Sequence, residues 1–102
     1  MNEFKPKKAS GASVLFNLGQ LLATPGALAA LERAGQSPVE FLARHCRGDW
    51  GDVGQADWEL NDAAVVEGTR LLSAYHTQRG ERLWIITEAD RSATTILLPD
   101  EY

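Results

Sequence analysis

Two pairs of a capping residue and a proline constrain the first half of this chain more than any other feature. Thr24-Pro25 and Ser37-Pro38 each place a hydroxyl side chain before a proline. Proline suits the first turn of a helix, because its missing N–H would have no helical partner there. Glycines follow at positions 35 and 48, where a left-handed residue readily ends a helix. The pattern predicts two short helices in a hairpin or corner.

Apolar residues at helical spacing predict which faces of the helices are buried. In the first helix the predicted face is Ala27, Leu28, Leu31 and Ala34, and in the second it is Val39, Leu42, Ala43 and Cys46. A third helix is predicted over residues 57–67, ended by Gly68, with acidic residues in its first turn where the helix dipole favours them. Its predicted inward residues are Leu60, Ala63 and Ala64.

The last third of the chain changes to a period of two, which is typical of strands. Strands are predicted over 70–76, 81–87 and 94–98, joined by a hairpin turn containing Gly80 and by a second turn over 88–92. Pro99 should stop the third strand at an edge of the sheet. The predicted fold is therefore α+β, with three helices packed on one face of a C-terminal three-stranded antiparallel meander.

The length of 102 residues predicts one domain, placed over residues 13–102. Residues 1–12 contain three lysines and little that could be buried, so they are predicted to be a flexible basic tail. Val14, Leu15 and Phe16 form the first apolar cluster, which fits either a short strand or a helical turn.

Composition narrows the classes of function. The net charge of −4 argues against direct nucleic-acid binding. The single cysteine, Cys46, excludes a disulfide framework within the chain and suits a reducing compartment. The first lysines are not followed by an apolar run, and no stretch approaches the roughly 20 apolar residues of a membrane helix. We therefore expect a cytoplasmic protein without a membrane partner.

Three residues are candidates for catalysis. His45 precedes Asp49 by four positions, a spacing that can set a carboxylate beside a general base. With Tyr75 and Arg91 it could form a small metal-independent ribonuclease site. The structural alternative is a histidine that favourably interacts with a helix C-terminus. The chain has no phosphate loop, nucleophile elbow or zinc motif, and no metal or cofactor is expected.

An acidic middle region is the candidate for partner binding. No basic residue lies between Arg47 and Arg70, whereas six acidic residues do: Asp49, Asp52, Asp57, Glu59, Asp62 and Glu67. Such a region is either a solvated face or a docking surface for a basic protein partner. The segment 49–52 also reads as a tight turn that Trp50 anchors in the core.

The loop between the last two predicted strands adds a second candidate. Asp90 and Arg91 there either close the turn or meet a partner's charged group. The predicted partner-binding residues are Asp49, Asp52, Asp57, Asp90 and Arg91.

Several strings resemble those of a small family of bacterial proteins found on plasmids and integrative elements. These strings are LGQLLATPGALAAL, RHCRGDWGDV, GTRLLSAY and LWIITEADRSATTILLPDEY, and together they cover most of residues 16–102. Members are often labelled plasmid-related proteins, and some carry the label of a restriction–modification subunit. A methyltransferase subunit needs a cofactor-binding domain, for which this chain is too short. The resemblance implies an accessory role in a mobile element and no particular reaction.

Together these observations predict a non-enzymatic interaction protein of bacterial mobile elements. Its expected partner is a protein, such as a CRISPR or restriction complex that it inhibits. The alternative is a small metal-independent ribonuclease or toxin that uses His45, Tyr75 and Arg91. A further alternative is a homodimer formed through an exposed edge strand that ends at Pro99.

Overall fold

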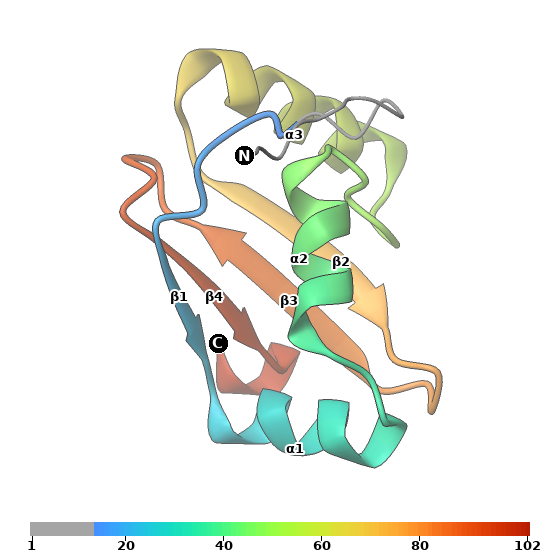
Figure 1. The fold of residues 1–102 in the computed structure, drawn as a ribbon. Coiled ribbons are helices and arrows are strands. Elements are labelled where there is room, and N and C mark those ends of the chain that lie inside the picture. Colours follow the sequence, from blue (N-terminus) through green and yellow to red (C-terminus); the bar gives the residue numbers. More distant parts are fainter. Residues whose placement is uncertain (1–13) are drawn as a thin grey trace, which may run out of the picture.

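A computed structural model describes residues 14–102, which form a four-stranded mixed sheet with helices on both faces (Figure 1). The elements in chain order are β1 (Gln20–Ala23), α1 (Pro25–Ala34), α2 (Pro38–Cys46), α3 (Gln55–Glu67), β2 (Leu71–His76), β3 (Arg82–Thr87), β4 (Ala93–Leu97) and the short 3₁₀ helix η2 (Pro99–Glu101). The predicted α+β class is confirmed. The tail predicted over residues 1–12 lies outside the described residues.

The sheet has the strand order β1-β4-β3-β2. Strands β2, β3 and β4 form the predicted antiparallel meander, but β1 pairs in parallel with β4, with Gln20 opposite Ala93 and Ala23 opposite Ile96. The prediction of a three-stranded sheet was therefore wrong, and so was the prediction of an edge at Pro99. β1 is too short for its own pattern to reveal it, and its partner lies at the far end of the chain.

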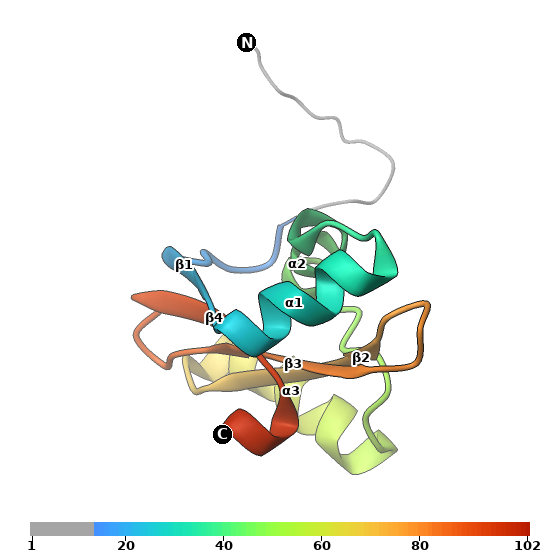
Figure 2. The same ribbon diagram turned by 90° about the horizontal axis from the view of Figure 1, so that it is seen from below.

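The helices divide between the two faces of the sheet. Figure 2 shows α1 and α2 on one side and α3 on the other, so the prediction of three helices on one face was wrong. The reason is the path of the chain between α2 and α3. There Gly51 forms a parallel bridge with Ala74 of β2, so the chain passes along this edge before it enters α3.

The helices α1 and α2 begin and end at or near the predicted capping and stop residues. Thr24 Oγ1 accepts a hydrogen bond from the Ala27 N–H at 3.1 Å, and Ser37 Oγ accepts one from the Val39 N–H at 3.2 Å. Gly35 ends α1 in a left-handed conformation, at φ 65°. The predicted starts and stops of α1 and α2 are therefore confirmed to within two residues, because they depend on local chemistry.

The predicted buried faces are only partly right. Val39, Leu60 and Leu28 keep 68%, 67% and 50% of their surface exposed. In α2 the sheet-facing side is instead formed by Phe41, Leu42, His45 and Cys46. Both sides of this short helix carry apolar residues, so spacing alone could not choose between them. The side with the larger ring and the hydrogen-bonding histidine packs on the sheet.

Two groups of buried side chains form the core. One lies between α1, α2 and the sheet and includes Leu31, Phe41 and Ile85. The other gathers around Trp50, which is wholly buried and donates from Nε1 to Asp62 Oδ1 at 2.9 Å. Trp50 thus anchors the turn between α2 and α3, as the sequence predicted.

Candidate functional site

A chain of buried hydrogen bonds runs through the sheet from His45 on α2. Its Nδ1 lies 2.5 Å from Ser73 Oγ, and its Nε2 lies 2.9 Å from Thr87 Oγ1. Thr87 Oγ1 lies 2.8 Å from Thr94 Oγ1, which donates to the Leu18 carbonyl at 2.7 Å. This series of hydrogen bonds therefore includes one hydroxyl from each of β2, β3 and β4. The four side chains that form it, those of His45, Ser73, Thr87 and Thr94, are 0% exposed.

His45 is held as a neutral ring in this environment. Burial, with a smaller effect from the charge of Arg91, lowers its pKa to about 4. The rings of Phe16 and Trp50 pack edge-on against it at centroid distances of 5.2 and 5.7 Å. Because both ring nitrogens are bonded inside the core, the geometry favours a structural role for His45 over that of a general base.

His45 does not pair with Asp49, so the alternative that set this carboxylate beside a general base is wrong. Asp49 Oδ2 instead accepts from Arg44 Nε at 2.7 Å, and Asp49 Oδ1 accepts from the Gly51 N–H at 3.2 Å. The hydrogen bond from Arg44 lowers the pKa of Asp49. The Arg44 side chain is 39% exposed and reaches the carboxylate at the surface, whereas His45 is buried. Asp49 is thereby a structural part of the turn.

Tyr75, the second catalytic candidate, is also buried. Its hydroxyl donates to the main-chain carbonyl of Asp49 at 2.6 Å, and burial raises its pKa to about 12. Its ring packs against the Phe41 ring, with 5.6 Å between the ring centres, and lies beneath the Arg44 guanidinium, whose Cζ is 4.5 Å from the centre of the Tyr75 ring. Tyr75 therefore ties the turn after α2 to strand β2.

Arg91, the third candidate, closes the end of α3. Its guanidinium donates to the carbonyls of Ala64, Thr69 and Glu88 at 2.9, 2.7 and 3.2 Å. It also lies over the Phe16 ring at 5.5 Å, so Arg91 and His45 both contact this one ring. The backbone of Arg91 is left-handed, at φ 61°, which fits the tight turn between β3 and β4.

The remaining predicted partner-binding residues are exposed. Asp52 Oδ2 lies 3.4 Å from His76 Nδ1, and Asp57 lies in the first turn of α3. Asp90 Oδ1 accepts from the Ser92 N–H at 3.0 Å, and hydrogen bonds to Ser92 lower the pKa of Asp90. Each carboxylate is therefore available to a partner at the surface.

The five predicted residues do not form one surface. Arg91 contacts the C-terminal end of α3, whereas Asp57 lies in the first turn of the same helix. The helix has 13 residues, and each adds about 1.5 Å of length. Asp52 and Asp57 therefore belong to one region, and Asp90 with Arg91 to another.

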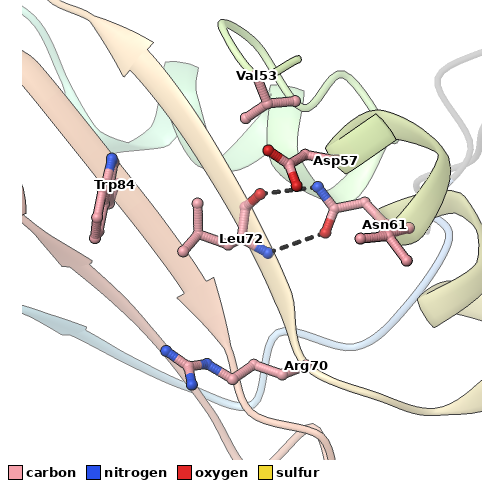
Figure 3. A pocket seen from close by; sticks show the side chains of 7 residues that line it. Val53, Asp57, Asn61, Arg70, Leu72 and Trp84 are labelled. Carbon is pink, nitrogen blue, oxygen red and sulfur yellow. Dashed lines mark hydrogen bonds between the residues drawn. The ribbon is translucent and has the colours of Figure 1, made fainter. Parts of the chain in front are cut away.

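A groove lies between α3 and the adjacent face of the sheet (Figure 3), with a volume of about 500 Å³. It is lined by Val53, Asp57, Leu60, Asn61, Arg70, Leu72 and Trp84. Sequence reasoning missed this groove. The signal was present in β3, where Trp84 alternates with the buried Leu83 and Ile85 and so must face the other side of the sheet.

Polar side chains fix the shape of the groove. Asn61 Nδ2 donates to the Leu72 carbonyl at 2.8 Å, while Asn61 Oδ1 accepts from the Leu72 N–H at 3.1 Å. The Arg70 guanidinium donates to the Tyr102 hydroxyl and lies 5.2 Å from the centre of that ring. The Trp84 ring packs edge-on against the same Tyr102 ring, with 5.7 Å between the two ring centres.

Charge is one-sided along the helix that forms a wall of the groove. All charged residues of α3 are acidic, namely Asp57, Glu59, Asp62 and Glu67. Leu60, in the same wall, is 67% exposed. The groove thus combines apolar side chains with an acidic rim along α3, where Asp57 lies, and has Arg70 at its other end (Figure 3). The α3 side suits a positively charged and partly apolar segment.

Comparisons with protein-family models, with curated proteins and with solved structures found no match for this chain. Within residues 14–102, no three His, Cys, Asp or Glu side chains are placed so that they could hold a metal ion. Over the same residues, the helices are too short or too polar to cross a membrane.

Proposed function

We propose that this chain is a non-enzymatic interaction protein that holds a basic, partly apolar segment of a protein partner in the groove between α3 and the sheet. The observation that carries this proposal is the combination, in one concave surface, of exposed or partly exposed apolar residues and an acidic α3 wall, with the one cation among the described lining residues, Arg70, bonded to Tyr102. Leu60, Leu72 and Trp84 supply the apolar part, and Asp57 supplies charge at the rim.

Each part contributes to binding in a different way. Burying apolar surface is worth about 25 cal/mol per Å², so contacts with Leu60 and Trp84 would supply affinity. The acidic rim would speed encounter with a basic partner and reject acidic ones. Arg70 is held by Tyr102, which keeps this cation at one end of the groove and away from Asp57 in the first turn of α3.

The alternative, a small ribonuclease, is less well supported. His45 and Tyr75 are 0% and 1% exposed, and the Arg91 guanidinium is occupied by main-chain carbonyls. These contacts give all three side chains a role in holding the fold together. A nuclease would need a base and a cation that reach a phosphate from solvent.

The partner's identity is a further part of the proposal. The family resemblance of the sequence supports an accessory role in a mobile element. The small size, the acidity and the lack of catalytic motifs in the sequence support a cytoplasmic inhibitor of a host defence complex of the CRISPR or restriction type. Such an inhibitor needs a docking surface and no chemistry. Nucleic acid is disfavoured as the direct ligand, because the rim of the groove and the net charge of −4 would repel phosphates.

Site-specific photo-crosslinking tests the groove. A benzophenone amino acid replaces Leu60, which lines the groove, or Val66, which is 86% exposed on the same helix but does not line it. After irradiation in bacterial cells, mass spectrometry identifies the crosslinked segments. We expect adducts from the Leu60 position only, on a segment that has net positive charge and apolar residues.

Charge reversal gives a matched control. Asp57→Lys should abolish the adduct, whereas Glu32→Lys, an equal change at an exposed position of α1, should leave it intact. Asp49 is not used because its carboxylate holds the turn after α2. Equal adducts from positions 60 and 66, or a crosslinked segment with net negative charge, would refute the groove as the docking site.

Infection assays test the defence target. Cells with an active CRISPR or restriction system are challenged with a phage that the system recognises, with and without expression of this protein. We expect expression to raise plaque counts and Asp57→Lys to remove that gain. Unchanged plaque counts against both kinds of system would refute the inhibitor proposal while leaving the crosslinking result to stand by itself.

A further inference from the structure

The outer edge of β1 carries main-chain groups that no described residue uses. The Gln20 N–H donates to the Ser92 carbonyl, and the Thr24 N–H donates to the Ile96 carbonyl, both at 3.0 Å. In a parallel ladder every second residue bonds to the same neighbour. The N–H and C=O groups of Leu21 and Ala23 therefore point away from β4, at the end of the sheet where β1 lies (Figure 1).

Apolar side chains surround this edge on both faces. Leu21 and Leu22 are 55% and 44% exposed, and as neighbours in a strand they point to opposite faces of the sheet. Val39 of α2, 68% exposed, lines a shallow hollow with Leu21 and Leu42 beside the strand. Another chain that paired with β1 would thus gain apolar contacts as well as hydrogen bonds.

Charge is missing from this part of the sequence. No charged residue and no histidine occurs between Lys8 and Glu32, a stretch that includes all of β1. Natural sheets usually protect an exposed edge with a charged side chain, a proline or a bulge. β1 contains no charge and no proline, so its short length of four residues is the only usual protection of an edge seen in the described strand.

We propose that β1 is the interface for a second copy of this chain, which pairs with it antiparallel about a two-fold axis at Leu22. In this register Leu21 faces Ala23 of the other copy, and each of the two such pairs exchanges two hydrogen bonds. The Leu22 side chains meet across the axis in the closer, non-hydrogen-bonded pairing. The two four-stranded sheets become one continuous sheet.

A second copy fits this edge better than a charged partner does. Two copies that each carry a net charge of −4 repel each other wherever charged faces meet, so a self-contact needs an uncharged surface. The side chains of β1 and of the hollow beside it supply one, because Leu18, Leu21, Val39 and Leu42 are uncharged. The Glu101 carboxylate lies just beyond β1, where it accepts a hydrogen bond from Thr24. The outward groups at Leu21 and Ala23 also provide equal numbers of donors and acceptors, as a symmetric interface requires.

Sedimentation and amide hydrogen exchange on the full chain test this interface together. We expect a concentration-dependent dimer, with exchange at the Leu21 and Ala23 amides slowed at least tenfold at the dimer concentration relative to dilution. Leu22→Lys should give a monomer by setting two like charges across the axis. The matched control is Val66→Lys, at a residue that is 86% exposed on α3, and it should remain dimeric.

Three results would overturn the proposal. They are a monomer at all concentrations, a dimer that persists in Leu22→Lys, and a dimer in which the Leu21 and Ala23 amides exchange as fast as in the dilute protein. Thermal melting followed by circular dichroism verifies that Leu22→Lys is folded. If that variant does not fold, Leu22→Gln is used, because it replaces the apolar contact with a polar, uncharged side chain and should weaken the dimer at least tenfold.

Discussion

The two edges of the sheet differ in how their main-chain groups are used. At β2, the Asn61 side chain bonds both the N–H and the carbonyl of Leu72, and the turn around Gly51 bonds both groups of Ala74. At β1, the corresponding groups of Leu21 and Ala23 have no partner within residues 14–102. Among residues 14–102, one edge is covered by the chain itself and the other is left open.

The residues that cover a sheet edge in this fold are found at β2 and not at β1. The β2 edge uses a glycine with left-handed backbone, a buried tryptophan and an amide that fits one strand residue. The β1 edge has one amide side chain, Gln20, followed by apolar residues, and it carries no charge. Covering an edge requires specific side chains, so an edge without them is a candidate for contact with another chain.

Replacing Gly51 with valine should have the largest effect, because it breaks the covered edge. Gly51 has φ 79°, and a Cβ there would collide with the Ala74 carbonyl oxygen and the Tyr75 ring. We expect a loss of about 4 kcal/mol or more in the free energy of unfolding, measured with urea. Gly54→Ala, where a Cβ meets open space, should change it by less than about 1 kcal/mol. Equal losses of unfolding free energy in Gly51→Val and Gly54→Ala would contradict the role of Gly51 in covering the β2 edge.

Acid should loosen the hydrogen-bond chain that links the two edges, from Ser73 in β2 to Leu18 just before β1. An unfolded histidine has a pKa near 6.5, whereas that of His45 is about 4. Between these values the unfolded chain binds more protons, so stability falls as the pH falls. We expect a loss of about 3 kcal/mol between pH 7 and pH 4, measured by urea unfolding at each pH.

The exposed histidine provides the control for this pH dependence. His76 lies at the β2 edge, and its side chain is 43% exposed. His76→Gln should keep the full loss of stability between pH 7 and pH 4, and His45→Gln should remove most of it. If the loss of stability between pH 7 and pH 4 disappears in His76→Gln instead, then His76 and not His45 causes the pH dependence.

Asn61→Ala should have an intermediate effect at the covered edge. It leaves the N–H and carbonyl of Leu72 without their side-chain partner, which should cost about 2 kcal/mol in unfolding free energy. Hydrogen exchange at the Leu72 amide should also speed up. Gln55→Ala removes an exposed amide bonded only to Glu59 on the same helix and should cost less than about 0.5 kcal/mol. Similar costs would mean that Asn61 does not protect the edge.

Leu22→Lys should have the smallest effect on the monomer. Leu22 is 44% exposed at the open edge, so in dilute solution the unfolding free energy should change by about 0.5 kcal/mol or less. The measurement is urea unfolding at a concentration where the protein sediments as a monomer. A loss above about 2 kcal/mol would show that Leu22 belongs to the core and that the two edges differ less than described.

The sequence predicted the elements that depend on local chemistry. The caps at Thr24 and Ser37 and the stop at Gly35 were predicted from residues within one turn of each other. β1 was missed because its four residues become a strand only by pairing with β4, a contact that local pattern does not encode. The side of the sheet taken by α3 depends on the bridge at Gly51, which is equally non-local.

The candidate site was predictable only in part. The acidic character of the region around Asp57 follows directly from the sequence, and the exposed position of Asp52 fits it. The groove depends on which sheet face lies next to α3, so Trp84 and Arg70 could not be assigned to it. Asp49 was assigned to binding because its partner Arg44, five residues earlier, was not recognised.

The pairing of β1 with β4 has a consequence for how the chain is made. Gln20 pairs with Ala93, so β1 leaves the ribosome long before its partner strand exists. The helices α1 and α2 can form early from local signals, but the sheet cannot close until residues 93–97 have emerged, and such long-range closure slows folding. During that interval β1 has not yet paired with β4, so the main-chain groups on both of its edges can bond to another strand. Nascent chains on one messenger would therefore present this strand to each other before either has completed its own sheet.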